Sequence, residues 1–361
     1  MSPKLPRLYV ATLTAAALLT SGCAMAQVAP PAPQIPSTAS SLPDDPAFDG
    51  LLQAFDVPGL AIATLTGCNV DGVRTIGMAD LHSGMPVTQN TAFEAASLSK
   101  PVFAYLVLQL ADEGVIDLDA PIGPLDYPRI ADRDTLAKLT PRMVLTHRTG
   151  LPNWAGDSLD EDRTDALSFE AAPGTQYSYS GEAFEILRAF VVQQTGLSLQ
   201  QLFEQRLGAI MPNSSFDGRL RGEATGSKAY VAASAPDTVR PLNTQPHQTG
   251  AAWGLLTTAG DYAAFLSEVC RAQKLTPAMQ TDMLRPQSPI PDSAGLGPSS
   301  YGLGWVVMEL GSETIVMHSG NNDEYRSLAA YLPDTGEGYV VLTNGRNGED
   351  LIMALLQQAD Q

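Results

Sequence analysis

The chain has 361 residues, 44% of them hydrophobic, which is enough to bury one large core or two closely packed subdomains. Its 39 acidic and 21 basic residues give a formal net charge of −18 at pH 7. Such acidity argues against nucleic acid and anionic membrane surfaces as partners. The four histidines lie far apart without ligand-like spacing, so neither a metal site nor another cofactor is predicted.

The first 26 residues predict an export signal. Lys4 and Arg7 form its positively charged start, and residues 8–20 form its apolar run. That run is too short and too rich in alanine for a stable transmembrane helix, so its removal after export is expected. The sequence therefore predicts an exported, periplasmic protein.

Two cleavage sites fit this export signal. The residues that end at Cys23 resemble a bacterial lipobox, in which Cys23 becomes the lipidated first residue and anchors the protein to the membrane. Residues 24–26, Ala-Met-Ala, form a small-x-small site that would instead release a soluble protein. We favour the lipoprotein, with residues 27–47, rich in Pro, Ala and Ser, as an extended tether.

The remaining residues, 48–361, predict a single domain with strands at both ends and helices between them. A hairpin is expected from residues 60–65 and 73–77. The other expected elements are helices at 97–114, 140–147, 182–195 and 259–271, and strands at 301–307, 314–318, 327–332 and 338–343. This order predicts an α+β fold in which one antiparallel sheet comes from both chain ends (48–116 and 250–361), flanked by helices, around a central helical subdomain (117–249).

A Ser-x-x-Lys pair, Ser97 and Lys100, opens the first long helix. Three residues on a helix bring both side chains to one face. Apart from Gln109, the residues from Val102 to Leu110 are apolar or aromatic on all sides, which predicts a buried helix that ends at Gly114. A serine hydroxyl is a weak nucleophile until a base removes its proton, and a desolvated lysine can be that base.

Other polar and aromatic residues favour structural interpretations. Cys68 and Cys270 are expected to be two small buried hydrophobic residues rather than a disulfide, although an exported protein allows the disulfide. The acids Asp117, Asp119 and Glu182 are expected to be solvated or to cap helices, and the tryptophans Trp154, Trp253 and Trp305 to wall the core or a cleft.

Six ordered blocks of the sequence resemble the serine β-lactamase-related family, which includes class C β-lactamases, DD-peptidases and carboxylesterases. The blocks are residues 91–100, 114–122, 144–152, 173–181, 301–305 and 318–320. The resemblance implies the β-lactamase and penicillin-binding-protein fold. It also implies that Ser97 is the nucleophile and Lys100 its partner.

The resemblance also assigns roles to residues far from Ser97 in the sequence. Tyr179 matches the tyrosine of the Tyr-x-Asn motif, which shares proton transfer with the lysine. Tyr177 is the rival candidate, but its spacing within the block favours a core residue. In the third motif His318 is expected to be a catalytic residue beside the nucleophile, and Ser319 and Gly320 to bind the substrate. The backbone N–H of Asn321 joins that of Ser97 as the oxyanion hole.

Two positions depart from the family pattern. Gly181 replaces the asparagine of the second motif, which would hold a substrate amide, and His318 replaces the lysine that many class C enzymes carry. His147 belongs to a recurring block but has no assigned chemistry, so a structural role is predicted. Gly181 is still expected to lie at the substrate site.

The resemblance therefore implies an exported serine hydrolase that cleaves an ester or an amide, or a peptidoglycan-type peptide, through an acyl-enzyme. We expect an esterase or a D-peptidase rather than an efficient β-lactamase. A class C-like β-lactamase is one alternative, and a non-catalytic β-lactam or peptidoglycan sensor is another. The intact Ser97, Lys100 and Tyr179 argue against the sensor. The acyl group and the oligomeric state are not predicted.

Overall fold

The structure is a computed structural model that describes residues 45–156, 165–242, 250–291 and 298–358. The predicted export signal, Cys23 and nearly all of the predicted tether lie outside these ranges. Within them, no helix is both long enough and apolar enough to cross a membrane.

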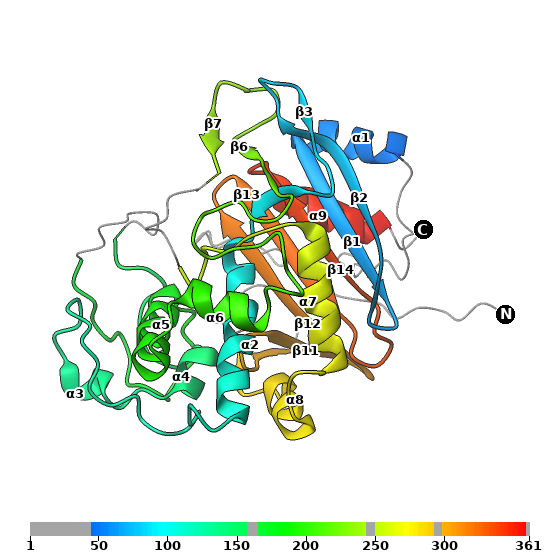
Figure 1. The fold of residues 1–361 in the computed structure, drawn as a ribbon. Coiled ribbons are helices and arrows are strands. Elements are labelled where there is room, and N and C mark those ends of the chain that lie inside the picture. Colours follow the sequence, from blue (N-terminus) through cyan, green and yellow to red (C-terminus); the bar gives the residue numbers. More distant parts are fainter. Residues whose placement is uncertain (1–44, 157–164, 243–249, 292–297, 359–361) are drawn as a thin grey trace, which may run out of the picture.

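A nine-stranded sheet forms the centre of the molecule, in the order β3-β2-β1-β14-β13-β12-β11-β10-β9 (Figure 1). Its strands are β1 (Gly59–Thr66), β2 (Asn69–Asp80), β3 (Met85–Pro86), β9 (Ser288–Pro289), β10 (Ser299–Tyr301), β11 (Val306–Leu310), β12 (Glu313–Asn322), β13 (Tyr325–Tyr331) and β14 (Gly338–Thr343). Strand β1 pairs antiparallel with β14 on one side and with β2 on the other. The predicted sheet from both chain ends is confirmed.

The β1–β2 hairpin turns at Gly67 and Cys68. Both residues have a left-handed backbone, with φ of 55° and 62°, which matches the twist of a two-residue hairpin turn. Cys68 forms a disulfide with Cys270, their Cα atoms 5.6 Å apart. The expectation of two free cysteines was therefore wrong, because the fold brings the turn beside the helix that carries Cys270.

The strand predicted at 301–307 is in fact two strands. Strand β10 ends at Tyr301 and β11 begins at Val306, and the two pair antiparallel. The chain reverses between them, where Gly304 has a φ of 88° and the N–H of Gly302 donates to the carbonyl of Trp305 at 2.8 Å. Alternating apolar residues continued across the turn, so the pattern alone hid it.

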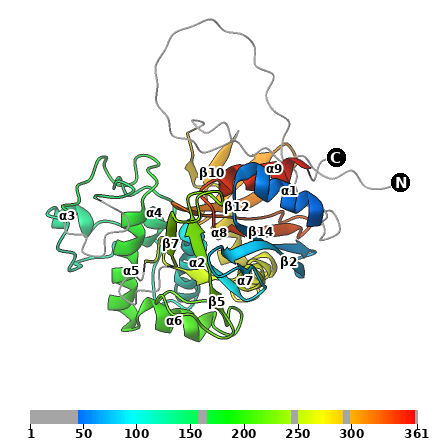
Figure 2. The ribbon, with the colours of Figure 1, turned by 90° about the horizontal axis from the view of Figure 1, so that it is seen from above.

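Helices cover both faces of the sheet (Figure 2). Helices α1 (Asp45–Phe55) and α9 (Gly348–Gln358) pack together over one face. Helix α7 (Ala259–Arg271) lies on the other face, against β1, β2 and β14. Helix α1, whose first residues fall within the predicted tether, and helix α9 were not predicted from the sequence.

The segment between the two halves of the sheet contains helices that are joined by long loops. Its helices are α3 (Arg133–Leu136), α4 (Pro141–Leu145), α5 (Gly181–Thr195) and α6 (Leu199–Arg206), and α8 (Pro277–Leu284) follows α7. Short strands β4 (Thr91–Glu94), β5 (Thr225–Gly226) and β8 (Leu256–Thr257) form a small sheet, and β6 (Lys228–Tyr230) pairs with β7 (Val239–Pro241).

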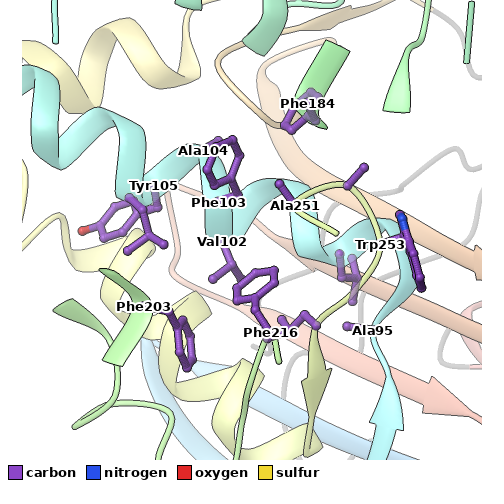
Figure 3. Packing of buried hydrophobic residues seen from close by; sticks show 14 of the residues in the cluster. Ala95, Val102, Phe103, Ala104, Tyr105, Phe184, Phe203, Phe216, Ala251 and Trp253 are labelled. Carbon is purple, nitrogen blue, oxygen red and sulfur yellow. The ribbon is translucent and has the colours of Figure 1, made fainter. Parts of the chain in front are cut away.

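Helix α2 (Ser99–Asp112) lies at the centre of the main core. Every residue from Ser99 to Leu110 is buried. Figure 3 shows Phe103 of this helix and Phe184 of α5, whose ring centroids are 6.2 Å apart. One continuous apolar cluster includes side chains of the sheet, of α2 and of the helical segment, so α2 is fixed from all sides. The predicted division at residues 117 and 249 stays a prediction.

Candidate active site

Ser97 and Lys100 meet where the chain enters helix α2. Ser97 lies in the 3-10 turn η2 (Ala96–Leu98), which follows β4, and Ala96 has a left-handed φ of 52°. Lys100 Nζ donates to Ser97 Oγ at 3.0 Å and to the carbonyl of Ala252 at 2.9 Å. The predicted contact between the two side chains is therefore present.

The surroundings of Lys100 favour its neutral form. The residue is 1% exposed, and burial lowers its pKa from 10.5 to about 7, opposed by the charge of Glu185. Glu185 is itself tied to the peptide of Ala252, because its Oε1 accepts the Ala252 N–H at 3.0 Å. Its Oε2 accepts from Arg188 Nε at 2.8 Å. At neutral pH the Lys100 amine is therefore unprotonated in a large fraction of the molecules, and in this form it can accept a proton.

Tyr179 completes this group. Its phenol shares a hydrogen bond with Ser97, and Lys100 Nζ lies 4.8 Å from the centroid of its ring. Burial raises the pKa of Tyr179 well above its usual range, only partly opposed by the Ser97 hydrogen bond, so the phenol keeps its proton. Tyr177 instead packs edge-on against His147 at 6.1 Å between centroids and is half-buried rather than fully in the core.

His147 supports the extended segment that carries Tyr179. Its ring centroid lies 4.3 Å from that of Tyr179, and its Nδ1 accepts the N–H of Ser180 at 3.0 Å. Burial and the charge of Lys100 lower the pKa of His147 well below its usual range, so the ring is neutral. Ser180 in turn caps α5, since its Oγ accepts the N–H of Ala183 at 3.0 Å.

His318 is buried beside the same group. Its Nδ1 donates to the carbonyl of Ser319 at 2.7 Å, so its Nε2 accepts the hydroxyl of Tyr301 at 2.5 Å. Burial, followed by the charge of Lys100, lowers the pKa of His318 to about 3. The ring is therefore neutral at physiological pH and supplies no positive charge to the site.

Gly320 allows strand β12 to approach the turn of the nucleophile. A Cβ atom on Gly320 would lie 2.5 Å from the carbonyl oxygen of Ala95 and 3.0 Å from the Cβ of Ala96. Only glycine therefore fits this contact. Asn321 follows, opposite Arg326 in the ladder with β13, in a strand that contacts the η2 turn of Ser97. Its part in an oxyanion hole stays a prediction.

Glu182, expected to be a solvated or capping acid, is fully buried. Its two carboxylate oxygens accept from Arg129 at 2.7 and 2.9 Å. The expectation failed because the partner lies 53 residues away in the sequence. Asp119, by contrast, is largely exposed, although it pairs with Arg142 at 2.7 Å.

Within the described ranges, no three His, Cys, Asp or Glu side chains lie close enough together to hold a metal ion. The site geometry is thus built from Ser97, Lys100, Tyr179 and the neutral imidazoles.

Comparison with known proteins places this geometry in a family. The sequence model of the Beta-lactamase family matches residues 45–361. The chain belongs to the Beta-lactamase family. The resemblance predicted from the six sequence blocks is confirmed, and so is the fold.

Curated relatives of this Beta-lactamase family member have varied names. Penicillin-binding protein 4 of Amycolatopsis lactamdurans is 25% identical over 82% of this chain and 84% of its own length. Esterase EstB of Burkholderia gladioli is 31% identical over 43% of this chain and 45% of its own. Unguisins hydrolase ungD of Aspergillus violaceofuscus is 25% identical over 81% of this chain, which spans only 59% of that relative.

Solved structures share the fold at low identity. A class C β-lactamase has a TM-score of 0.71 at 19% identity, covering 87% of this chain and 94% of its own. The D-amino acid amidase of Ochrobactrum anthropi, complexed with L-phenylalanine amide, has a TM-score of 0.68 at 20% identity, covering 87% of this chain and 98% of its own. At these identities the likeness shows the fold alone.

Proposed function

We propose that this protein is an exported serine hydrolase that forms an acyl-enzyme on Ser97, and that it prefers esters or D-amino acid peptides to β-lactams. The contact of 3.0 Å between Lys100 Nζ and Ser97 Oγ, made by a lysine whose pKa is lowered to about 7, carries the proposal. A relative named as an esterase and a fold neighbour named as a D-amino acid amidase support it.

In the proposed acylation, Ser97 Oγ attacks the substrate carbonyl carbon while neutral Lys100 accepts the hydroxyl proton. The bond to the leaving group breaks, and the leaving group takes a proton that passes through the phenol of Tyr179. In deacylation, water attacks the acyl carbonyl carbon and gives one proton to Lys100. The bond between that carbon and Ser97 Oγ then breaks, and Lys100 returns the proton to Oγ, which regenerates the serine hydroxyl and the neutral amine. Backbone N–H groups of Ser97 and Asn321 would stabilise the oxyanion in both steps.

The proposed preference against β-lactams follows from the residues at two positions, 318 and 181. An efficient class C site holds the substrate carboxylate with a cation and the side-chain amide with an asparagine, where this chain has neutral His318 and Gly181. A hydrogen bond to a charged group contributes roughly 1.5–3 kcal/mol and a neutral one about 1 kcal/mol. Their loss corresponds to on the order of a hundredfold or more in kcat/KM.

The test compares a p-nitrophenyl short-chain ester, a D-Ala-D-Ala peptide and a chromogenic cephalosporin on one preparation, with Ser97→Ala as the control. The ester or the peptide should have the highest kcat/KM, and Ser97→Ala should reduce it to background. A higher kcat/KM for the cephalosporin than for the ester and the peptide would contradict the proposal and favour a β-lactamase. Labelling of Ser97 by a fluorescent phosphonate without any turnover would favour a sensor.

Export and lipidation at Cys23 belong to the same proposal and rest on residues 1–26.

A further inference from the structure

An indole ring lies against the start of helix α5, two residues after Tyr179. A Cβ atom built on Gly181 would overlap Cη2 and Cζ2 of Trp154 and lie 2.8 Å from its Cε2. The indole thus occupies the volume that any side chain at position 181 would take. Trp154 is only partly buried and packs on the main core.

The indole lies on the same side of the chain as the nucleophile. Ser180 has an extended backbone, with φ of −141° and ψ of 114°, so the Cβ directions of residues 179 and 181 point to the same face. Tyr179 uses that face to reach Ser97. Alternate residues of an extended chain are about 6–7 Å apart, so the indole is within one acyl-group length of the Tyr179 side chain.

The backbone on each side of Trp154 is tied to the start of α5. The Oδ1 of Asn153 accepts the N–H of Gly181 at 3.0 Å, and its carbonyl accepts the N–H of Glu182 at 3.1 Å. The N–H of Ala155 donates to Glu182 Oε1 at 3.2 Å. Arg129, which pairs with Glu182, also donates to the carbonyl of Ala155 at 3.2 Å. Trp154 is therefore fixed on both sides: by backbone N–H groups of α5 at Asn153, and by the ion pair of Glu182 with Arg129 at Ala155.

We propose that Trp154 is the specificity-determining residue of this site and that it binds an uncharged, apolar acyl group, of the length of a butyryl to hexanoyl chain, over its indole face. The proposal rests on the function proposed above. Gly181 and the pair of Glu182 with Arg129 are positioning residues that fix the indole. The neutral His318 agrees with this chemistry, because it offers no cation to a charged acyl group.

The first test measures kcat/KM for p-nitrophenyl acetate, butyrate and hexanoate. Each methylene removed from water corresponds to about a fourfold gain, so contact with two or three methylenes corresponds to about a tenfold to fiftyfold preference for hexanoate over acetate. Trp154→Ala should reduce the hexanoate-to-acetate ratio by at least about tenfold, mainly through KM, and Trp154→Phe should give an intermediate ratio.

Leu197→Ala is the matched control. Leu197 is also a half-buried apolar residue, but it follows the far end of α5, which spans Gly181–Thr195 and is therefore about 22 Å long. Its loss should leave the hexanoate-to-acetate ratio unchanged. A ratio that stays constant in Trp154→Ala, while Ser97-dependent hydrolysis persists, would overturn the role of Trp154 alone. If the wild-type protein hydrolyses the D-Ala-D-Ala peptide but none of the three esters, the role of Trp154 fails while the proposed function stands.

A second test detects the contact itself, even if Trp154→Ala is poorly active. Gly181 has no positive φ, so Gly181→Ala fits the backbone and should be neutral or stabilising in a helix without the indole. In the wild-type background the new methyl overlaps Trp154, so Gly181→Ala should lower Tm and alter the hexanoate-to-acetate ratio. In the Trp154→Ala background it should do neither. Additive effects in this double-mutant cycle would contradict the proposed placement.

Discussion

Replacing Lys100 by methionine should abolish hydrolysis and at the same time stabilise the fold in mildly acidic solution. Burial lowers the pKa of Lys100 from 10.5 to about 7. Between these pH values the unfolded chain carries a proton that the folded chain does not, so the stability of the wild type rises with pH in this window. Below about pH 7 both states are protonated, and the cost of burying the amine is constant.

The magnitude follows from the difference between the two pKa values, 10.5 and about 7. Each pKa unit corresponds to about 1.4 kcal/mol, so the buried amine costs about 5 kcal/mol at pH 6 and about 2 kcal/mol at pH 9. Methionine has no such cost. The two hydrogen bonds that Lys100 makes contribute about 1 kcal/mol each and lower the advantage of the variant equally at every pH.

Urea unfolding of the wild type and Lys100→Met at pH 6, 7.5 and 9 measures this difference. The advantage of the variant should shrink by about 3 kcal/mol between pH 6 and pH 9. Lys138→Met, at an exposed position, is the control and should show no comparable trend. An advantage that is the same at pH 6 and pH 9 would mean that the amine is not desolvated, and the argument for Lys100 as a base would fail.

Three further changes test other parts of the structure. Glu185→Gln removes a charge that raises the pKa of Lys100, so the acidic limb of the kcat/KM profile should move to lower pH; an upward shift would refute this coupling. Changing both Cys68 and Cys270 to serine should cost about 2–5 kcal/mol in unfolding free energy, and reductant should then have no further effect on Tm. Cys23→Ser should release the protein from membranes or leave the export signal uncut; a mature N-terminus at Gln27, found by mass spectrometry, would exclude lipidation.

Local sequence patterns predicted most of the contacts and helix ends that involve residues close together in the sequence. The spacing of Ser97 and Lys100 predicted their contact, because a helical turn fixes it. Gly114 ends the helix with a left-handed φ of 73°, as expected. The pairing of β1 with β14 followed from strands at both ends of the chain, since a sheet needs partners and the centre offered few strands.

Contacts between distant segments could not be predicted in the same way. The sequence places Gly181 in a motif but does not reveal that Trp154 fills the space above it. The burial of Glu182 depends on Arg129, and the disulfide joins residues 202 positions apart. For each of these residues the sequence also allowed a local role, such as a solvated acid or an unpaired cysteine. Only the packing of distant segments decides between that local role and the long-range contact. The aromatic contact between His147 and Tyr179 belongs to the same class, and a histidine in a recurring block was its only sequence signal.

The position of β1 between β2 and β14 has a consequence for the order of events during synthesis. One edge of β1 has no partner until β14 has been made, and Ser97 has no neighbouring β12 until Gly320 has been made. A ribosome that adds about 5–20 residues per second needs on the order of tens of seconds to cover that interval. During this time the early strands present an open edge that favours association with other chains. The nucleophile therefore enters a complete site only after nearly all of the chain has been synthesised, so the nascent protein stays inactive until the sheet closes.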